Sequence, residues 1–359
     1  MGKRNAHPTL SDVARIAKVG VGTASRVING GVNVSPMTMQ RVESAIRKLG
    51  YLPNHAARVL KGGRTKTVGL LVPSIADSFF ASCAEAAGKV ARCHDSLLIV
   101  AVTNNQSDAE MGNLDVLMRH RPDGLLIVPS DSENEALATF VRKSAIPVVI
   151  FDRPLFGSDC ANVVTDNFEA ARNATRHLIK HGYKRILCFG GEPELYSISE
   201  RLRGYRRAMK EAGLAPLVDS SRCDVAHLAA RALAVHLKHA RPPDAIFTLK
   251  NSSTIITFQA LQQLKVPVPA RVALLGFDDF ELAATLRPSI SVIQQPIEEV
   301  GRRAAELLFE QIQDLDGTKR YRRVNREPVV LPSRFVARRS CGCKGVAAGR
   351  KDKLVQAKQ

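Results

Sequence analysis

Most of the chain alternates between short apolar runs and stretches with helical periodicity. The apolar runs have the length of buried strands, and they lie at 67–72, 96–102, 124–128, 148–151, 185–189, 245–249, 272–276 and 291–293. The helical stretches lie near 82–92, 109–119, 133–143, 168–181, 199–212, 228–239, 254–263 and 296–315. Alternation of this kind predicts parallel sheets that are covered by helices on both faces. The units are too many for one small sheet, and the break near 162–167 predicts two Rossmann-like α/β lobes.

The first 50 residues have the pattern of three short helices. Thr9 and Asp12 have the spacing of a capping box, and apolar residues follow at helical spacing at Leu10, Val13, Ala14 and Ala17. A second helix is expected at 21–28, ended by the Asn-Gly-Gly sequence at 29–31. Ser35 and Pro36 begin a third helix, which ends at Gly50 and buries Val42, Ala45, Ile46 and Leu49. A tight turn between the first two helices predicts a helix-turn-helix module, a small all-α DNA-binding domain.

Such a module places its second helix in the major groove of DNA. That helix would present Val21, Gly22, Thr23, Ser25 and Arg26. Arg26 is able to make a bidentate contact with guanine, whereas Thr23 and Ser25 suit hydrogen bonds to phosphates or base edges. The alternative is a helical bundle whose polar face is only solvated.

The distribution of charge favours the DNA-binding interpretation. The 359 residues have a formal net charge of +18, and 45% of them are hydrophobic, which excludes a disordered chain. Residues 1–66 hold 12 Lys and Arg against 2 Asp and Glu, residues 67–318 hold 27 against 30, and residues 319–359 hold 13 against 2. A near-neutral body with basic ends is typical of a nucleic-acid binder with a separate regulatory or catalytic core. A basic cluster before the strand-like segment 328–331 is expected in a solvated loop, with an extra DNA contact as the alternative: Lys319, Arg320, Arg322 and Arg323.

Other features limit the location and chemistry of the protein. The sequence has no run of about 18 apolar residues and no apolar stretch behind its basic start, so we expect neither a transmembrane helix nor a secretory signal. The 7 cysteines include no C-x-x-C pair, which favours reduced thiols in a cytoplasmic protein. Phosphate-loop, nucleophile-elbow and dinucleotide motifs do not occur, so we expect no enzyme and no cofactor. We expect His177 and His181 on a surface helix and Cys341 and Cys343 in a loose tail, without a metal.

The N-terminal module resembles that of the LacI/GalR family of bacterial transcriptional regulators. The resemblance rests on residues 9–17 (TLSDVARIA), 23–29 (TASRVIN) and 50–54 (GYLPN), followed by Ala57 and Leu60. In that family the last segment is a hinge helix, which forms on operator DNA and inserts a leucine, here Leu60, into the minor groove; an apolar wedge of this kind kinks the duplex. The expected DNA-binding residues are Thr9, Leu10, Ser11, Val21, Gly22, Thr23, Ser25, Arg26, Asn29, Asn54, Ala57 and Leu60.

The module departs from the family pattern around the start of its second helix. Lys18, Val19 and Gly20 stand where Gly-Val-Ser is usual, and the family's two main specificity positions fall on Val21 and Gly22. Neither side chain hydrogen-bonds a base edge, although Val21 is able to touch a thymine methyl group. Glycine inside a short helix costs about 1 kcal/mol relative to alanine. The resemblance therefore implies DNA binding but leaves the operator sequence open.

The rest of the chain resembles the effector domain of the same family, so the resemblance covers about residues 8–340. The matching motifs are Val72-Pro73-Ser74, Asp77-Ser78-Phe79-Phe80, Asp123-Gly124-Leu125, Phe151-Asp152-Arg153, Val164-Thr165-Asp166-Asn167, Gly190-Gly191, Arg201-Leu202-Arg203-Gly204-Tyr205, Gly276-Phe277-Asp278-Asp279 and Gln295-Pro296. That domain resembles periplasmic sugar-binding proteins of type I, with two α/β lobes, three crossovers and a cleft. The expected domains are a helix-turn-helix domain at 8–52, a hinge at 53–65, an effector domain at 66–340 and a disordered basic tail at 341–359. One lobe would comprise 66–165 and 296–324, and the other 166–295 and 325–340.

Polar and aromatic residues gather just beyond the expected ends of the strands, where open α/β sheets bind ligands. A polyhydroxylated ligand needs carboxylate, amide and guanidinium groups together with aromatic walls. The expected effector-binding residues are Ser74, Asp77, Phe79, Phe80, Asp152, Arg153, Asn167, Arg201, Asn251, Phe277, Asp278 and Gln295. For each of them, a salt bridge between lobes, a loop cap or core packing is the alternative. The family usually has Asn-Asp where this chain has Asn251 and Ser252, so the missing acid leaves the identity of the effector open.

These features predict a DNA-binding repressor of carbohydrate-metabolism genes. The resemblance implies a homodimer on a pseudo-palindromic operator, without contact with a membrane. It also implies a sugar, sugar acid or sugar phosphate as effector, acting either as inducer or as co-repressor. The alternative is a soluble sugar-binding protein or carbohydrate enzyme without specific DNA binding. Salt-sensitive binding to a pseudo-palindromic DNA distinguishes the two.

Overall fold

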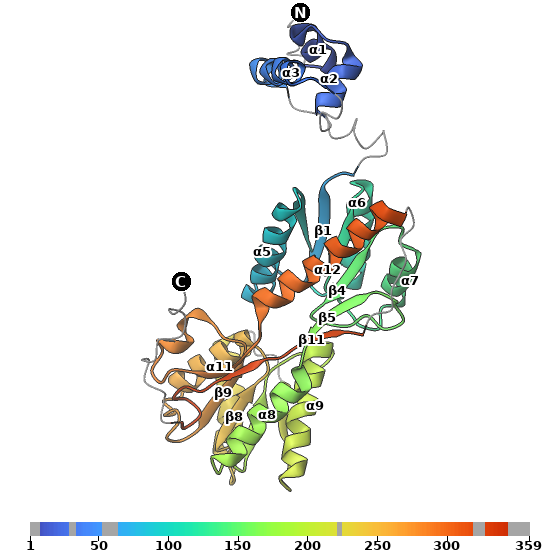
Figure 1. The fold of residues 1–359 in the computed structure, drawn as a ribbon. Helices are drawn as coiled ribbons and strands as arrows, with labels where there is room; N and C mark the ends of the chain where they lie inside the picture. Colours follow the sequence, from blue (N-terminus) through green and yellow to red (C-terminus); the bar gives the residue numbers. More distant parts are fainter. Residues whose placement is uncertain (1–7, 29–33, 52–63, 221–224, 319–326, 344–359) are drawn as a thin grey trace, which may run out of the picture. The chain divides into compact units, whose positions relative to one another are not determined.

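The computed structural model describes residues 8–28, 34–51, 64–220, 225–318 and 327–343 (Figure 1). The chain divides into two compact units, Met1–Thr65 and Lys66–Gln359, which we call the head and the body. Hydrophobic clusters of buried residues form within each unit. Among the described residues, no helix combines the length and the apolar composition that crossing a bilayer requires.

The head is a bundle of three helices, as its pattern predicts. The helices are α1 (Leu10–Ala17), α2 (Val21–Ile28) and α3 (Pro36–Leu49). The capping box of Thr9 and Asp12 is present, Ser35 caps α3, and Gly50 follows α3 in the left-handed conformation with a φ of 60°. The core consists of small side chains that allow the helices to approach closely: Val13, Ala14, Ala17, Ala24, Val42 and Ala45. The predicted helix end at 29–31 lies outside the described residues.

The first lobe of the body is a six-stranded parallel sheet in the order β11-β5-β4-β3-β1-β2. Its strands are β1 (Thr67–Val72), β2 (Leu97–Val102), β3 (Gly124–Ile127), β4 (Val148–Phe151), β5 (Ala161–Thr165) and β11 (Val329–Leu331). One face of the sheet packs against α5 (Ser78–Cys93) and α12 (Ile297–Thr318). The other face packs against α6 (Ser107–Arg119) and α7 (Glu135–Lys143). Because helices cover both faces, every residue of β3 and β4 is buried.

The second lobe repeats this architecture with a sheet in the order β12-β10-β9-β8-β6-β7. Its strands are β6 (Ile186–Phe189), β7 (Leu217–Asp219), β8 (Ala245–Thr248), β9 (Ala273–Phe277), β10 (Ser291–Gln294) and β12 (Arg334–Val336), and only the β10–β12 pair is antiparallel. One face packs against α8 (Asn167–Lys180) and α9 (Tyr196–Glu211), and the other against α10 (Ala226–Lys238) and α11 (Asn251–Gln263). A short 3-10 helix, η1 (Glu281–Ala284), follows β9. The predicted fold class is confirmed.

The chain passes between the lobes three times: after β5, after β10 and between β11 and β12 (Figure 1). Hydrogen bonds join these three segments to one another. The Asp166 carboxylate accepts the Ser333 backbone N–H at 2.8 Å, and the Thr165 hydroxyl donates to Gln295 Oε1 at 2.6 Å. The three crossovers therefore form one hinge region, and a rotation of one lobe against the other has to bend all of them.

The structure differs from the predicted pattern at three strands and one lobe boundary. β5, β7 and β12 were not predicted as strands. β5 includes the polar Asn162 and Thr165, while β7 and β12 are three-residue edge strands whose side chains are at most half-buried. The segment 325–340 was expected in the second lobe, but β11 pairs with β5 in the first lobe. The reason is that the chain crosses between the lobes only after Leu331.

The expectation of a loose tail from residue 341 is also wrong. Cys341 is completely buried, and its sulfur accepts a hydrogen bond from the Ser291 hydroxyl at 3.1 Å. The preceding Ser340 donates to the Leu274 carbonyl and accepts from the Ser291 backbone N–H, so the segment is fixed to the middle of the second sheet. The second lobe therefore includes Cys343, and the rest of the expected tail, 344–359, lies outside the described residues.

Candidate functional site

Helix α2 exposes most of the side chains that the sequence assigns to DNA. Val21, Gly22 and Arg26 are exposed, whereas Thr23 and Ser25 are half-buried. Ala24 is completely buried in the core of the head. Since residues four apart share a helix face, Gly22 and Arg26 lie on one side, and the small Gly22 leaves the backbone open to close approach there.

The start of α1 carries three more of the expected DNA-binding residues. Thr9 and Ser11 are exposed, but Leu10 packs against the core. The Thr9 hydroxyl donates to Asp12 Oδ2 at 2.7 Å, and the Arg15 guanidinium donates to Asp12 Oδ1 at 2.9 Å. The hydrogen bonds from Arg15 and Thr9 lower the pKa of Asp12 to about 2. Four expected residues lie outside the described residues: Asn29, Asn54, Ala57 and Leu60.

The body contains a cleft of about 290 Å³, which is near the lower end of the usual volumes of small-molecule pockets. It lies between the lobes beyond the carboxyl ends of their strands, where open α/β sheets bind ligands. The structure brings together ten of the twelve expected effector-binding residues in its lining: Ser74, Asp77, Phe79, Phe80, Asp152, Arg153, Arg201, Asn251, Asp278 and Gln295. Eight further residues line it: Pro73, Asn104, Asn105, Glu192, Leu195, Ser197, Ile198 and Lys250.

Two aspartates at strand ends carry unusual backbone conformations. Asp152 directly follows β4 with a φ of 66°, and Asp278 directly follows β9 with a φ of 67°. This left-handed region is uncommon for residues other than glycine, and such conformations occur most often at functional sites. In each case the backbone N–H is held by the neighbouring strand, with bonds to the carbonyls of Val163 at 2.9 Å and Ile293 at 2.8 Å. The sheets therefore direct both carboxylates into the cleft lining.

Each aspartate is accompanied by a buried arginine. Arg153 Nε lies 3.2 Å from Asp152 Oδ2, and its Nη1 donates to Asn105 Oδ1 at 2.8 Å. Arg201 Nη1 lies 3.6 Å from Asp278 Oδ2. Burial raises the pKa values of both aspartates, while the arginines oppose that rise. Because each carboxylate is paired with a guanidinium group, neither charge is buried without a partner. Both groups can therefore remain charged in the cleft and form hydrogen bonds with the hydroxyl groups of a ligand.

Two expected effector-binding residues, Asn167 and Phe277, are not in the cleft lining and instead contact Arg201. Asn167 stands at the first turn of α8, and its Oδ1 accepts the Arg201 Nε–H at 2.7 Å. The Phe277 ring is completely buried, and its centroid lies 3.7 Å from Arg201 Cζ. In addition, Arg201 Nη1 donates a hydrogen bond to the Leu249 carbonyl oxygen at 2.7 Å. These residues are therefore positioning residues for the arginine that the cleft displays.

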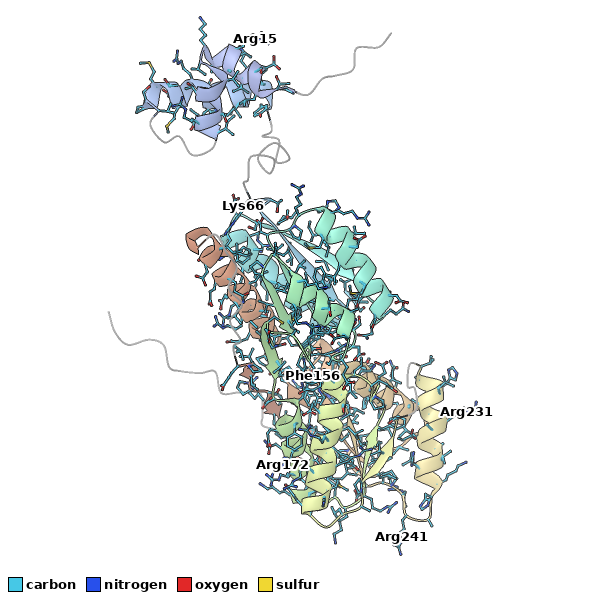
Figure 2. All side chains as sticks on the ribbon, turned by 90° about the vertical axis from the view of Figure 1, so that its right-hand side faces the viewer. Arg15, Lys66, Phe156, Arg172, Arg231 and Arg241 are labelled. Carbon is cyan, nitrogen blue, oxygen red and sulfur yellow. The ribbon has the colours of Figure 1, made fainter. Side chains whose placement is uncertain are left out.

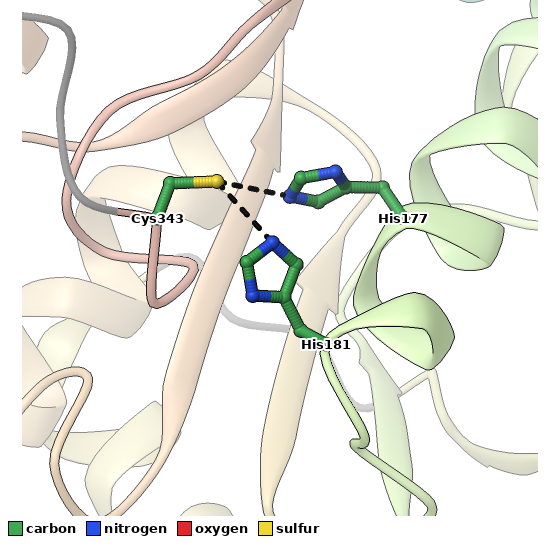
Figure 3. A group of neighbouring side chains, drawn as sticks. All are labelled: His177, His181 and Cys343. Atoms are coloured by element: carbon green, nitrogen blue, oxygen red, sulfur yellow. Dashed lines mark hydrogen bonds between the residues drawn. The ribbon is translucent and has the colours of Figure 1, made fainter.

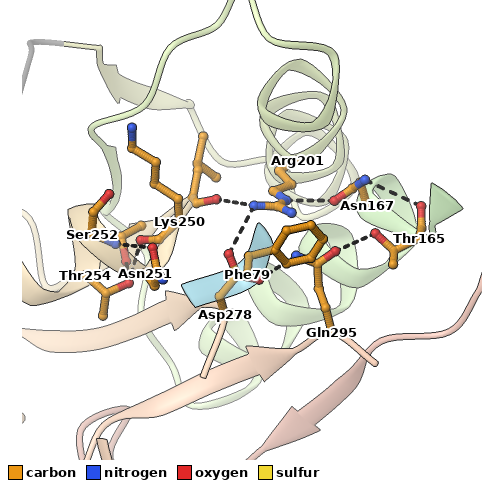
Figure 4. Close-up of polar contacts among 12 residues, drawn as sticks. Phe79, Thr165, Asn167, Arg201, Lys250, Asn251, Ser252, Thr254, Asp278 and Gln295 are labelled. Carbon is orange, nitrogen blue, oxygen red and sulfur yellow. Dashed lines mark hydrogen bonds and ion pairs between the residues drawn. The ribbon is translucent and has the colours of Figure 1, made fainter. Parts of the chain in front are cut away.

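Gln295 connects the cleft to the hinge region (Figure 4). Its Nε2 donates to Asp278 Oδ1 at 2.5 Å, and its Oε1 accepts the Thr165 hydroxyl at 2.6 Å. Gln295 lies on the second crossover, directly after β10, and Thr165 ends β5 at the first crossover. Asp278 is thus connected through Gln295 to two of the three segments that join the lobes.

Contacts between the lobes also occur beside the cleft. Asn251 Nδ2, at the start of α11, donates to the Ser78 hydroxyl at the start of α5 at 3.2 Å. Phe156 of the first lobe, labelled in Figure 2, meets Tyr196 of the second lobe edge to face, and the ring centroids are 5.8 Å apart. Asn251 therefore belongs both to the cleft lining and to a contact that depends on the angle between the lobes.

The residues that sequence reasoning missed include the polar Asn104, Asn105, Glu192 and Lys250. Lys250 Nζ pairs with Glu192 Oε1 at 3.2 Å. A position just after a strand, which singled out Asp152 and Asp278, could also have identified three of these residues. Asn104 and Asn105 closely follow β2, and Lys250 closely follows β8. Leu195, Ser197 and Ile198, which lie around the start of α9, have no comparable signal in the sequence.

Comparison with known proteins agrees with this arrangement. The profile of the family described as bacterial regulatory proteins, lacI family, matches residues 9–54, and that of periplasmic binding proteins and sugar binding domain of LacI family matches residues 65–335. The chain is 33% identical over 327 residues to the HTH-type transcriptional repressor PurR of Vibrio campbellii (strain ATCC BAA-1116), covering 90% of this chain and 97% of that protein. It is 31% identical over 330 residues to the ribose operon repressor of Escherichia coli (strain K12), covering 90% and 98%. The solved structure of the lac repressor dimer bound to operator and the anti-inducer ONPF has the same fold, with a TM-score of 0.82, 22% identity and coverage of 94% and 99%.

Proposed function

This chain belongs to the LacI family of bacterial regulatory proteins, and from that membership we propose that a sugar-like effector in the cleft controls its repression of carbohydrate-metabolism genes. It is a DNA-binding transcriptional regulator with a sugar-binding type of effector domain. Its named relatives are repressors, which supports repression rather than activation or catalysis. We propose a cytoplasmic location, because the chromosomal DNA that such a bacterial regulator binds is in the cytoplasm.

The chemistry of the cleft favours a neutral polyhydroxylated ligand over an anionic one. The lining includes four carboxylates, Asp77, Asp152, Glu192 and Asp278, and three cations, Arg153, Arg201 and Lys250. All three cations already lie within 3.6 Å of a carboxylate oxygen. A sugar acid or sugar phosphate would therefore have to compete with these pairs, whereas hydroxyl groups can donate to carboxylates and accept from amides and guanidinium groups. Phe79 and Phe80 supply apolar surface for the face of a sugar ring.

We propose a homodimer, in which two heads read the two halves of a pseudo-palindromic operator. One helix-turn-helix contacts too few bases for high specificity, and two-fold symmetry doubles the contacts. The basic head, with 12 Lys and Arg against 2 Asp and Glu in residues 1–66, supplies the phosphate contacts. Arg26 is the base-reading side chain, and Leu60 is the proposed minor-groove wedge.

Control by the effector requires that it bind two arrangements of the lobes with different affinities. Asp278 and Arg201 lie in the second lobe, Asp152 and Arg153 lie in the first, and a ligand that contacts both pairs favours one angle between the lobes. The observation that carries the proposal is the presence of two buried acid–arginine contacts, one from each lobe, in the lining of one cleft. Gln295 links the contact in the second lobe to the hinge region.

A thermal-shift screen with neutral sugars, sugar acids and sugar phosphates tests the effector class. Binding to the folded state raises the unfolding temperature. The proposal predicts a shift with at least one neutral sugar that is absent in the Arg201→Ala variant. Shifts only with phosphorylated compounds would contradict the choice of a neutral ligand, and shifts that persist in Arg201→Ala would place the ligand elsewhere.

A further inference from the structure

Two histidines meet two cysteines on the second lobe, away from the cleft lining. The histidines precede the cysteines by at least 160 positions in the sequence. His177 lies on α8, and His181 caps the C-terminus of that helix, so the two rings are one turn apart. Cys341 and Cys343 lie in the segment after β12 that returns to this helix. The ligand atoms of His177, His181 and Cys343 all lie within 4.8 Å of one another (Figure 3).

The distances match those of a metal site. Cys343 Sγ lies 3.5 Å from His177 Nε2 and 3.3 Å from His181 Nε2, and Cys341 Sγ lies 3.4 Å from His177 Nε2. Zinc binds sulfur at about 2.3 Å and imidazole nitrogen at about 2.0–2.1 Å in tetrahedral geometry, which separates N and S ligands by about 3.5 Å. Three sulfur–nitrogen pairs thus have the spacing that a shared ion gives its ligands. The ligand atoms of His177, His181 and Cys343 are all mutually close, and Cys341 adjoins this group at His177.

The cysteine segment is fixed in place by contacts that do not involve the histidines. Arg338 forms a two-pronged ion pair with Asp279 at 2.7 and 2.9 Å, and Ser340 is bonded to Leu274 and Ser291. Gly342, between the two cysteines, has a φ of 89°, and a Cβ there would lie 2.6 Å from the Tyr183 hydroxyl. The glycine therefore allows the segment to approach α8 closely enough for its thiols to reach the rings.

We propose that His177, His181, Cys343 and Cys341 bind one Zn²⁺ ion, which fastens the C-terminal segment to α8. Two thiolates and two imidazoles form a donor set that suits zinc in structural sites, and both side-chain pairs come from ordered backbone. His181 is exposed and Cys343 is half-buried, so an ion can enter from solvent. On binding, each thiol loses its proton to solvent as its sulfur bonds to the metal, without an oxidant or a reductant.

The test uses the untagged full chain, purified with a thiol reductant and loaded with zinc chloride. Bound zinc is measured by mass spectrometry after dialysis, and cobalt(II) is substituted to reveal the absorption of thiolate ligands in tetrahedral geometry. The proposal predicts about one zinc per chain, a thiolate–cobalt band and an increase in unfolding temperature with zinc. Cys343→Ser and His181→Ala should each weaken zinc binding by at least about 100-fold, because even the loss of an outer partner of a ligand costs 10–100-fold.

Matched controls are available in the first lobe. Cys93→Ser and His120→Ala make the same chemical changes at exposed positions, and both should keep the zinc content and the cobalt band of the wild type. A chain that stays free of zinc and lacks the thiolate–cobalt band would overturn the proposal. So would equal zinc affinity in Cys343→Ser and wild type, or equal losses in the control variants. Both tested substitutions are at exposed or half-buried positions, and circular dichroism verifies that the variants are folded.

Discussion

Asp152 and Asp278 occupy equivalent positions in the two lobes. Each directly follows a central strand, has a φ of 66–67°, bonds through its N–H to the next strand and has a buried arginine within 3.6 Å. The two halves of the cleft are thus built on the same plan from different segments of the chain. The proposed ligand would meet one carboxylate and one guanidinium group from each lobe, so its affinity would depend on the angle between the lobes.

Replacement of Asp278 by asparagine should remove the response to ligand but keep DNA binding. Asparagine tolerates the left-handed conformation and retains the size of the side chain, so the change removes mainly the charge. The loss of a hydrogen bond to a charged group predicts a 10- to 100-fold weaker affinity for ligand, about 1.5–3 kcal/mol, by calorimetric titration. Glu281→Gln, at an exposed position in η1, is the control and should bind ligand like the wild type. Wild-type affinity in Asp278→Asn would remove this carboxylate from the ligand site.

Replacement of Arg26 by alanine should reduce the preference for the operator but leave salt-sensitive binding to DNA of any sequence. A bidentate arginine–guanine contact contributes about 1–3 kcal/mol of discrimination between bases. We therefore expect the ratio of the affinities for operator and random DNA to be about 5- to 150-fold smaller in Arg26→Ala than in the wild type. Fluorescence anisotropy with both DNAs measures this. Arg119→Ala, on the exposed face of α6 in the body, should have no effect. Full operator preference in Arg26→Ala would mean that another element reads the bases.

Replacement of Gly22 by alanine should stabilise α2 but weaken DNA binding. No atom lies within 4 Å of a Cβ built at Gly22, and alanine is favoured over glycine in a helix by about 1 kcal/mol. The added methyl group, however, lies on the face shared with Arg26 and would keep the backbone from the DNA. Hydrogen exchange of the α2 amides in the full chain should slow by about fivefold, while operator affinity falls. Unchanged operator affinity would show that this face does not contact DNA.

The capping box of α1 should give the head a defined dependence on pH. Arg15 and Thr9 lower the pKa of Asp12 from 3.8 to about 2. A lowered acid pKa stabilises the folded state above pH 3.8, and this contribution is lost as the pH falls from about 4 to about 2. A carboxyl titration by NMR should show a midpoint near 2 for Asp12 and a higher midpoint in Arg15→Ala. A midpoint near 3.8 in the wild type would contradict the geometry of the capping box.

The sequence predicts the long, strongly patterned helices and strands. It does not predict strands whose conformation depends on pairing in the folded protein. Helix α2 is found at the predicted residues because the tight turn before it interrupts the helical pattern. β7 and β12 gain their strand conformation mainly from pairing with the edge of a sheet, which a three-residue pattern does not reveal. Most of the cleft lining was predictable, because many of its residues closely follow the ends of strands. The cluster of His177 and Cys343 was not, since its members are 166 positions apart and meet only in the folded chain.

We expect occupation of the cleft to change the affinity of the protein for operator DNA. The most direct measurement is an anisotropy titration of the full chain on its operator, with and without the sugar that gives the largest thermal shift, in wild type and Arg201→Ala. We expect the operator dissociation constant of the wild type to change by at least about tenfold, within the usual range of allosteric coupling, and that of Arg201→Ala to stay unchanged. An operator affinity that the bound sugar leaves unchanged in the wild type would contradict the account.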